Sequence, residues 1–117
     1  MSKPMDQKTL NALGLCAKAR RLITGTPMVC ESLRCAKKPF LVLCAADNSE
    51  NTAKKLNDKC SFYGVPAVIL NASGAALADA VGKRGGQVAA VAVTDESFCR
   101  LIRSSLEQDR SGEKNTQ

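Results

Sequence analysis

Residues 40–70, FLVLCAADNSENTAKKLNDKCSFYGVPAVIL, contain the strongest fold signal of the sequence. They begin with an apolar run, residues 40–46, which is typical of a strand covered on both faces. A helix is predicted over residues 50–62, and Gly64 ends it. The residues that can cap its start are Asp47, Asn48 and Ser49. The apolar stretch 67–70 then follows as a second strand, so this segment reads as a strand–helix–strand unit.

Helices and strands alternate along the rest of the chain as well. Apolar residues at helical spacing predict a helix over residues 6–20, and a second helix is expected from residue 27. Farther on we expect a short helix that Gly82 stops, a strand over residues 88–93 and a last helix capped by Asp95. The residues expected to face inward from the last helix are Phe98, Leu101 and Ile102. This alternation predicts an α/β fold, a three-layer α/β/α sandwich around a small central sheet that is largely parallel or mixed.

The length of 117 residues suits one core, and a single domain over residues 1–107 is expected. Residues 108–117 contain no apolar side chain, so we expect a flexible tail there. No apolar run approaches the roughly 20 residues of a membrane span. The polar start MSKPMDQK also lacks the pattern of a secretory signal. These observations predict a cytoplasmic protein with no membrane partner.

Several kinds of chemistry lack the residues that they need. The chain has no His, which removes the commonest general base and the commonest neutral metal ligand. Its six Cys include no C-x-x-C pair, which favours reduced, buried thiols over disulfides or a zinc site. The glycine-rich GKRGG of residues 82–86 resembles a phosphate-binding loop only weakly, because it has neither the P-loop nor the Rossmann pattern. We therefore expect no enzyme activity, no metal site and no small-molecule cofactor.

Positive charge is concentrated at the start of the chain. The formal net charge is +6. Residues 1–40 hold eight Lys or Arg and two acidic residues, whereas residues 41–117 hold nine of each sign. Such a concentration creates a local positive potential that attracts polyanions. The alternative interpretation is a basic face that serves only solubility.

A candidate binding site lies at TGTPMVCE, residues 24–31. Gly25 permits a turn, Thr26 can cap the second helix, and Pro27 suits the first helical position. A helix N-terminus presents unpaired N–H groups and partial positive charge, which suits a phosphate or the acceptor edge of a base. The basic loop of residues 82–87 would join this site if the sheet order brings the two together. Nucleic acid is the partner that these features imply.

Four segments of the sequence resemble, in the same order, the L-seven-Ae family of kink-turn RNA-binding ribosomal proteins, and most closely its bacterial YlxQ-type members. The matching pieces are Gly25, residues 45–52, Cys60 with Val65 and Pro66, and Gly82 with Lys83. The resemblance covers about residues 8 to 103 and implies one RNA-binding domain of the ribosomal-protein type.

The resemblance also implies a function, namely recognition of a kinked, internally looped RNA helix. In the family, sheared purine pairs lie against the N-terminus of the second helix, and the loop before the last strand covers a flipped-out nucleotide. The residues carried over by position are Gly25, Thr26, Pro27 and Met28 toward the bases, Arg34 and Lys37 or Lys38 toward the backbone, and Lys83, Arg84, Gly85, Gly86 and Gln87 toward the splayed nucleotide. RNA is commonly recognised at such unstacked bases.

One position departs from the family pattern. Six residues after Gly25 the family usually has Lys, and this chain has Glu31. A carboxylate there would oppose phosphates or acceptor edges, at a cost of roughly 1 to 3 kcal/mol. Alternatively, Glu31 accepts from a guanine N–H or pairs with Arg34 one turn away. Pro27 and Met28 also differ from the polar pair of the strongest kink-turn binders.

Two classes of function follow from these observations. The leading hypothesis is non-enzymatic binding of kink-turn-like RNA, either ribosomal or another non-coding RNA, with the ribosome as a further candidate partner. The rival is a protein-interaction module that retains the fold without kink-turn specificity.

Overall fold

The computed structural model describes residues 6–114, and their side chains as far as residue 110. In chain order the elements are α1 (Gln7–Lys18), β1 (Leu22–Thr24), α2 (Thr26–Leu33), β2 (Leu41–Cys44), α3 (Glu50–Tyr63), β3 (Ala67–Ile69), α4 (Gly74–Ala80), β4 (Ala90–Val93) and α5 (Glu96–Lys114). Helices and strands thus alternate, and the α/β class is confirmed. β1 is not among the three strands that the sequence predicts.

The four strands form a mixed sheet in the order β1-β4-β2-β3. Only β2 and β3 are parallel, whereas β4 is antiparallel to both of its neighbours. The expectation of a mixed sheet is therefore confirmed, and that of a largely parallel one is wrong. The cause is the path after α4. After α4 the chain turns back toward the start of that helix, where the Val88 N–H donates to the Gly74 carbonyl at 3.0 Å. β4 therefore starts at the edge of the sheet where β2 and β3 end, and it runs antiparallel to β2.

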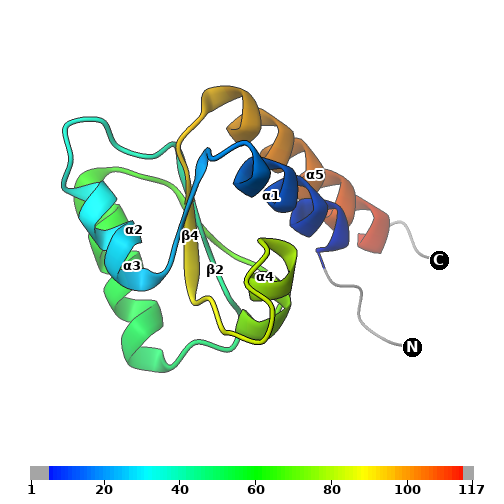
Figure 1. Ribbon diagram of the computed structural model, residues 1–117, viewed down its shortest axis with the longest axis horizontal. Helices are drawn as coiled ribbons and strands as arrows, with labels where there is room; N and C mark the ends of the chain where they lie inside the picture. Colours follow the sequence, from blue (N-terminus) through cyan, green and yellow to red (C-terminus); the bar gives the residue numbers. More distant parts are fainter. Residues whose placement is uncertain (1–5, 115–117) are drawn as a thin grey trace.

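Helices cover both faces of the sheet, which confirms the three-layer sandwich. α2 and α3 lie on one face, and α1, α4 and α5 lie on the other (Figure 1). β2 is buried along its whole length, as the apolar run predicts. Its side chains alternate between the layers: Leu41 and Leu43 pack with α1, α4 and α5, and Val42 and Cys44 pack with α2 and α3.

The boundaries of α3 follow from local sequence. The Ser49 side chain accepts a hydrogen bond from the Thr52 N–H at 3.2 Å, which caps the helix start. Gly64 ends the helix in the left-handed region, with φ of 72°, a conformation that glycine adopts without steric cost. Both roles are those that the sequence predicts.

The inward face of α5 differs in one residue from the prediction. Cys99, Ile102 and Leu106 are buried at spacings of three and four residues. Leu101 was expected to face inward, but its side chain is 42% exposed. It lies one position outside the buried stripe, so it points to solvent.

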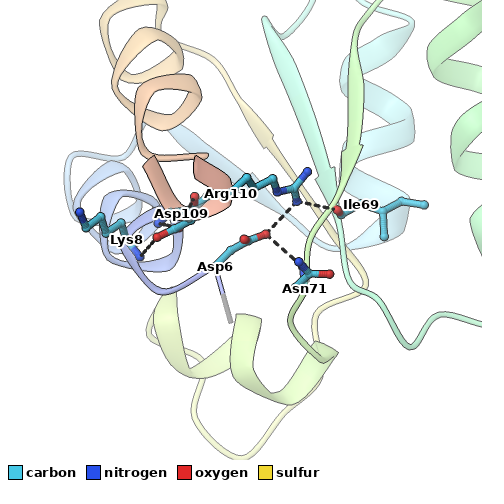
Figure 2. A network of polar contacts seen from close by, with 7 residues as sticks. Asp6, Lys8, Ile69, Asn71, Asp109 and Arg110 are labelled. Atoms are coloured by element: carbon cyan, nitrogen blue, oxygen red, sulfur yellow. Dashed lines mark hydrogen bonds and ion pairs between the residues drawn. The ribbon is translucent and has the colours of Figure 1, made fainter. Parts of the chain in front are cut away.

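The end of the chain also differs from the prediction. Where the sequence analysis expects a flexible tail from residue 108, α5 continues to Lys114; residues 115–117 lie outside the described part. Asp109 ties this end to α1, because its carboxylate accepts from the Lys8 N–H at 3.2 Å (Figure 2). It also accepts from both the backbone N–H and the hydroxyl of Thr9 at 3.0 Å. The polar composition of residues 108–117 does not predict this contact, which joins residues 100 positions apart.

A second polar contact joins the same helix end to β3. The buried carboxylate of Asp6 accepts from the Asn71 N–H at 3.1 Å and from Arg110 Nη2 at 2.9 Å. Arg110 also donates to the Ile69 carbonyl at 3.1 Å (Figure 2). These bonds hold the start of α1, the end of β3 and the last turns of α5 together.

The thiols differ widely in accessibility. All six are free, with Cys35 exposed and Cys16, Cys44 and Cys60 buried. Burial is the main cause that raises the pKa of Cys16 and of Cys44 to about 11. A thiol ionises near pH 9 in the unfolded chain, so the stability gained by keeping these two neutral is complete below about pH 9 and is lost as the pH rises toward 11.

Alkylation should therefore separate these thiols. At about pH 8, iodoacetamide is expected to modify Cys35 quickly and to reach Cys44 only after unfolding in guanidinium, because a buried neutral thiol is a poor nucleophile. Peptide mass spectrometry at timed intervals measures both rates. Native modification of Cys44 as fast as that of Cys35 would contradict the buried position.

Candidate nucleic-acid interface

The strand directions bring three helix starts to one edge of the sheet. β1, β2 and β3 run the same way, because β4 is antiparallel to β1 and β2, and β3 is parallel to β2. α2, α3 and α4 follow these strands and so begin where the strands end. The chain also enters β4 here. We call this the helix-start edge; it comprises residues 25–28, 45–49, 71–74 and 87–89 and lies toward the lower side of Figure 1.

Hydrogen bonds fix the segments of this edge to one another. The Gly25 N–H donates to the Ala90 carbonyl at 2.9 Å, so the start of α2 lies directly beside the start of β4. The Asn48 side chain donates to the Ala89 carbonyl at 3.1 Å. Asp47 accepts from the Gly74 N–H at 2.9 Å and thereby caps α4 rather than α3. From their position in the sequence, Asp47 and Asn48 were expected only to cap the following helix, because the segments that lie opposite them are distant in sequence.

The start of α2 differs from the other two helix starts. α3 and α4 are capped by the side chains of Ser49 and Ser73. At the start of α2, which lies wholly within the described residues, no side chain makes a capping hydrogen bond. The N-cap is Gly25, and Thr26, which was predicted to cap, is the first helical residue. The first-turn N–H groups of α2 are thus left without the side-chain acceptor that its neighbours have.

Space is open around this helix start. Gly25 has a φ of 95°, and a Cβ built on it would meet no atom within 4 Å. Pro27 is exposed, and the side chain of Met28 is 60% exposed. An incoming group can therefore approach the backbone of the first turn. Together, residues 25–28 make an open, partly positive surface on the helix-start edge.

The loop before β4 leads from the C-terminal end of α4 back to the helix-start edge, where Gln87 and Val88 lie beside Gly74. All of residues 82–87 are exposed. Two glycines with positive φ, Gly82 and Gly85, shape the turn. The Lys83 N–H donates to the Ala78 carbonyl at 2.8 Å, and the Gly86 N–H donates to the Lys83 carbonyl at 3.1 Å. The sheet therefore brings only the end of this loop, Gln87, to the edge where α2 starts. Gly82 and Arg84 lie beside Gly14 and Lys18 of α1.

Arg34, Lys37 and Lys38 lie elsewhere. They follow the C-terminal end of α2, whose eight residues span about 12 Å. The Phe40 N–H donates to the Val93 carbonyl at 2.8 Å, which puts the segment 34–40 at the opposite edge of the sheet. The three basic residues thus lie beyond the C-terminal end of α2, away from the candidate site at its start.

Glu31 is paired in this structure. Its Oε1 atom lies 2.6 Å from Nη2 of Arg34, and both side chains are largely exposed. The hydrogen bond from the guanidinium to Glu31 raises the pKa of Arg34 further. Among the interpretations left open by the sequence, the pair with Arg34 is the one present in the protein. The carboxylate therefore does not face the helix-start edge as an isolated negative charge.

Other kinds of site can be checked in the same structure. Within residues 6–110, whose side chains the structure describes, no group of three or more Cys, Asp or Glu side chains is arranged to hold a metal ion. None of the helices over that range is long and apolar enough to cross a bilayer. A groove of about 590 Å³ runs between α1 and α4, lined by residues that include Asn11, Leu15 and Asp79. It shares no residue with the helix-start edge.

Sequence comparison identifies relatives of this chain. The profile of the ribosomal protein L7Ae/L30e/S12e/Gadd45 family matches residues 7–102. The RNA-binding protein YlxQ of Bacillus subtilis is 41% identical over 95 residues, which are 81% of this chain and 91% of that protein. The RNA-binding protein YlxQ of Enterococcus faecium is 42% identical over 66 residues, covering 56% of this chain and 63% of that protein.

Solved structures show the same architecture. A Bacillus halodurans protein of unknown function superimposes with a TM-score of 0.76 at 32% identity, over 86% of this chain and 97% of that one. The 15.5 kD RNA-binding protein of Giardia lamblia gives 0.72 at 19% identity, over 90% and 87% of the two chains, and supports the fold alone. The profile match and the identity to the Bacillus subtilis protein show that this chain belongs to the ribosomal protein L7Ae/L30e/S12e/Gadd45 family, as a YlxQ-type member.

Proposed function

We propose that this protein binds structured RNA of the kink-turn type at the helix-start edge, without catalysis. The observation that carries the proposal is the start of α2, which has no side-chain cap and lies beside the start of β4, into which the exposed basic loop leads. Two relatives at 41% and 42% identity are named RNA-binding proteins. Ribosomal RNA or another non-coding RNA would be the partner.

Each part of the edge has a distinct role in this proposal. The first-turn N–H groups of α2 donate to acceptor edges of sheared purine pairs, and the missing side chain of Gly25 lets the RNA come close. Thr26 and Pro27 line the contact, and Met28 covers an exposed base. The loop residues Lys83, Arg84, Gly85, Gly86 and Gln87 enclose the flipped-out nucleotide. Arg34, Lys37 and Lys38, at the far end of α2, contact backbone phosphates of an adjoining segment.

A competition gel shift tests this proposal. A labelled kink-turn RNA is displaced by an unlabelled kink-turn or by a plain duplex of the same stems. We expect the kink-turn to compete at least tenfold better, and the affinity to fall steeply as salt rises from 50 to 200 mM. Equal competition by the duplex would reject kink-turn recognition and favour the protein-interaction module.

Charge reversal at Glu31 should strengthen binding. In the Glu31→Lys variant the pair with Arg34 is lost, and two cations on the outer face of α2 become available to phosphates. We expect about tenfold tighter binding of the kink-turn RNA in the same gel shift. Glu96→Lys is the matched control, because Glu96 also forms an exposed ion pair, with Arg100 at 3.4 Å, but lies on α5 in the other layer. Equal gains in both variants would mean that only net charge matters.

A further inference from the structure

Aromatic side chains gather at the edge of the sheet opposite the helix-start edge. The chain has four aromatic residues. Phe62 and Tyr63 end α3 and pack edge to face, with ring centroids 4.9 Å apart. Phe40 precedes β2 at the same edge, where its N–H is bonded to the end of β4. Three of the four aromatic residues therefore lie at this edge of the sheet, outside the helix-start edge.

These rings are unusually open to solvent. Phe62 is 80% exposed, the highest value for a large apolar side chain in the part of the chain that the structure describes. Phe40 is 44% exposed. Tyr63 packs partly against the core, and Lys38 Nζ lies 5.3 Å from the centre of its ring. The ring of Phe62 thus packs against Tyr63 and exposes most of its surface to solvent.

Basic side chains surround the rings. On α3, Lys55, Lys59 and Phe62 lie at spacings of four and three residues and share one flank. The other flank, with Ala53 and Asn57, lines a groove beside β3, so the basic flank faces α2.

Three more cations come from the segment after α2, namely Arg34, Lys37 and Lys38. The nearest carboxylates in sequence, Glu31 and Asp58, are held in ion pairs with Arg34 at 2.6 Å and with Lys54 at 3.4 Å. We call the set Arg34, Lys37, Lys38, Phe40, Lys59, Phe62 and Tyr63 the aromatic–basic patch.

This combination fits an unpaired RNA strand. Every base has a flat face that can stack on an aromatic ring, and the phosphates between bases require cations, so exposed rings among lysines form a platform for single strands. A stable protein interface would need a wider apolar centre. Here the residues adjoining Phe62 on the outer side of α3, Lys59, Asp58 and Ser61, are polar or charged.

We propose that the aromatic–basic patch binds a single-stranded RNA segment, with a base stacked on Phe62 and phosphates near Lys59 and Lys38. This rests on the proposed function for the class of partner. The rings and Lys59 lie outside the kink-turn site, whereas Arg34, Lys37 and Lys38 contribute to both. α2 spans the roughly 12 Å between the two edges. An unpaired strand that leaves a kinked RNA at the start of α2 can therefore reach Phe62 along the side of α2 and α3.

Tryptophan fluorescence tests this proposal directly. The chain has no Trp, so Phe62→Trp introduces a single reporter at the patch. We expect titration with a twelve-nucleotide oligouridylate to quench its emission to saturation, and added salt to reverse the quenching. Leu101→Trp is the matched control, because Leu101 is also exposed but lies on α5 in the other layer. Absence of quenching, or equal quenching in both variants, would overturn the proposal.

Binding measurements then separate the two sites. By fluorescence anisotropy, Phe62→Ala should weaken binding of labelled oligouridylate roughly tenfold, while Phe62→Trp retains it. A blunt-ended kink-turn RNA should bind Phe62→Ala normally. If oligouridylate binds Phe62→Ala as well as the unmodified protein, the patch is not a stacking site, whatever the kink-turn result. If the stacking test succeeds and the kink-turn competition fails, only the proposed function is rejected. If oligouridylate does not quench the fluorescence and a protein ligand is found whose binding requires Phe62, the patch is a protein-binding site and the proposal is overturned.

Discussion

Replacing Gly25 by glutamate is expected to abolish kink-turn binding. The new carboxylate would stand at the start of α2, where the RNA is proposed to place acceptor edges, so it would both fill the approach and repel the ligand. We expect the dissociation constant to rise more than about a hundredfold, which corresponds to about 3 kcal/mol. A gel shift with the kink-turn RNA measures the change.

The control for this variant is Gly25→Ala. Both substitutions impose the same strain, because a φ of 95° is unfavourable for any residue with a Cβ. A Cβ meets no other atom within 4 Å, so neither variant should disturb packing, and both should melt at similar temperatures. Gly25→Ala should retain most of the affinity. If the glutamate variant binds the kink-turn normally, the start of α2 is not the binding site.

Replacing Gly14 by leucine is expected to cause the largest loss of stability. Gly14 lies in α1 where this helix crosses α4, and a Cβ built on it would stand 2.8 Å from the Ala80 carbonyl oxygen. Backbone cannot move aside as a flexible side chain can, so α1 and α4 would have to separate. We expect a loss of about 3 kcal/mol or more in the free energy of unfolding, measured by urea denaturation.

Two further substitutions make this test specific. Gly14→Ala gains about 1 kcal/mol of helix propensity, so a net loss would show that the contact outweighs that gain. Gly86→Ala is a control, since the nearest atom to its Cβ would be 3.4 Å away, an ordinary contact. If the Gly14→Ala variant is more stable than the unmodified protein, α1 and α4 are not in such close contact.

Much of the fold could be predicted because its causes are local. The apolar run of β2 and the residues that begin and end α3, Ser49 and Gly64, each act within a few positions. The direction of β4 could not be predicted, because it depends on where the chain turns after α4. The helical end of α5 also escaped prediction, since Asp109 and Arg110 contact residues about 40 to 104 positions away.

The candidate site was predictable in part for a similar reason. The start of α2 has a local sequence pattern, and the resemblance supplied the loop before β4. Whether these two segments meet depends on the sheet order, which only the structure gives. Local pattern also misplaced the cap, because Thr26 is a better capping residue than Gly25 yet stands inside the helix. The distance of Lys37 and Lys38 from the helix start, and their nearness to exposed rings, required three-dimensional coordinates.

The open start of α2 has a consequence for what counts as the complete molecule. Its neighbours α3 and α4 carry their own terminal acceptor on a serine, whereas α2 leaves that place empty. If an acceptor group of the RNA occupies this place, the RNA serves as an intermolecular helix cap. The hydrogen bonding of α2 is then completed only in the complex.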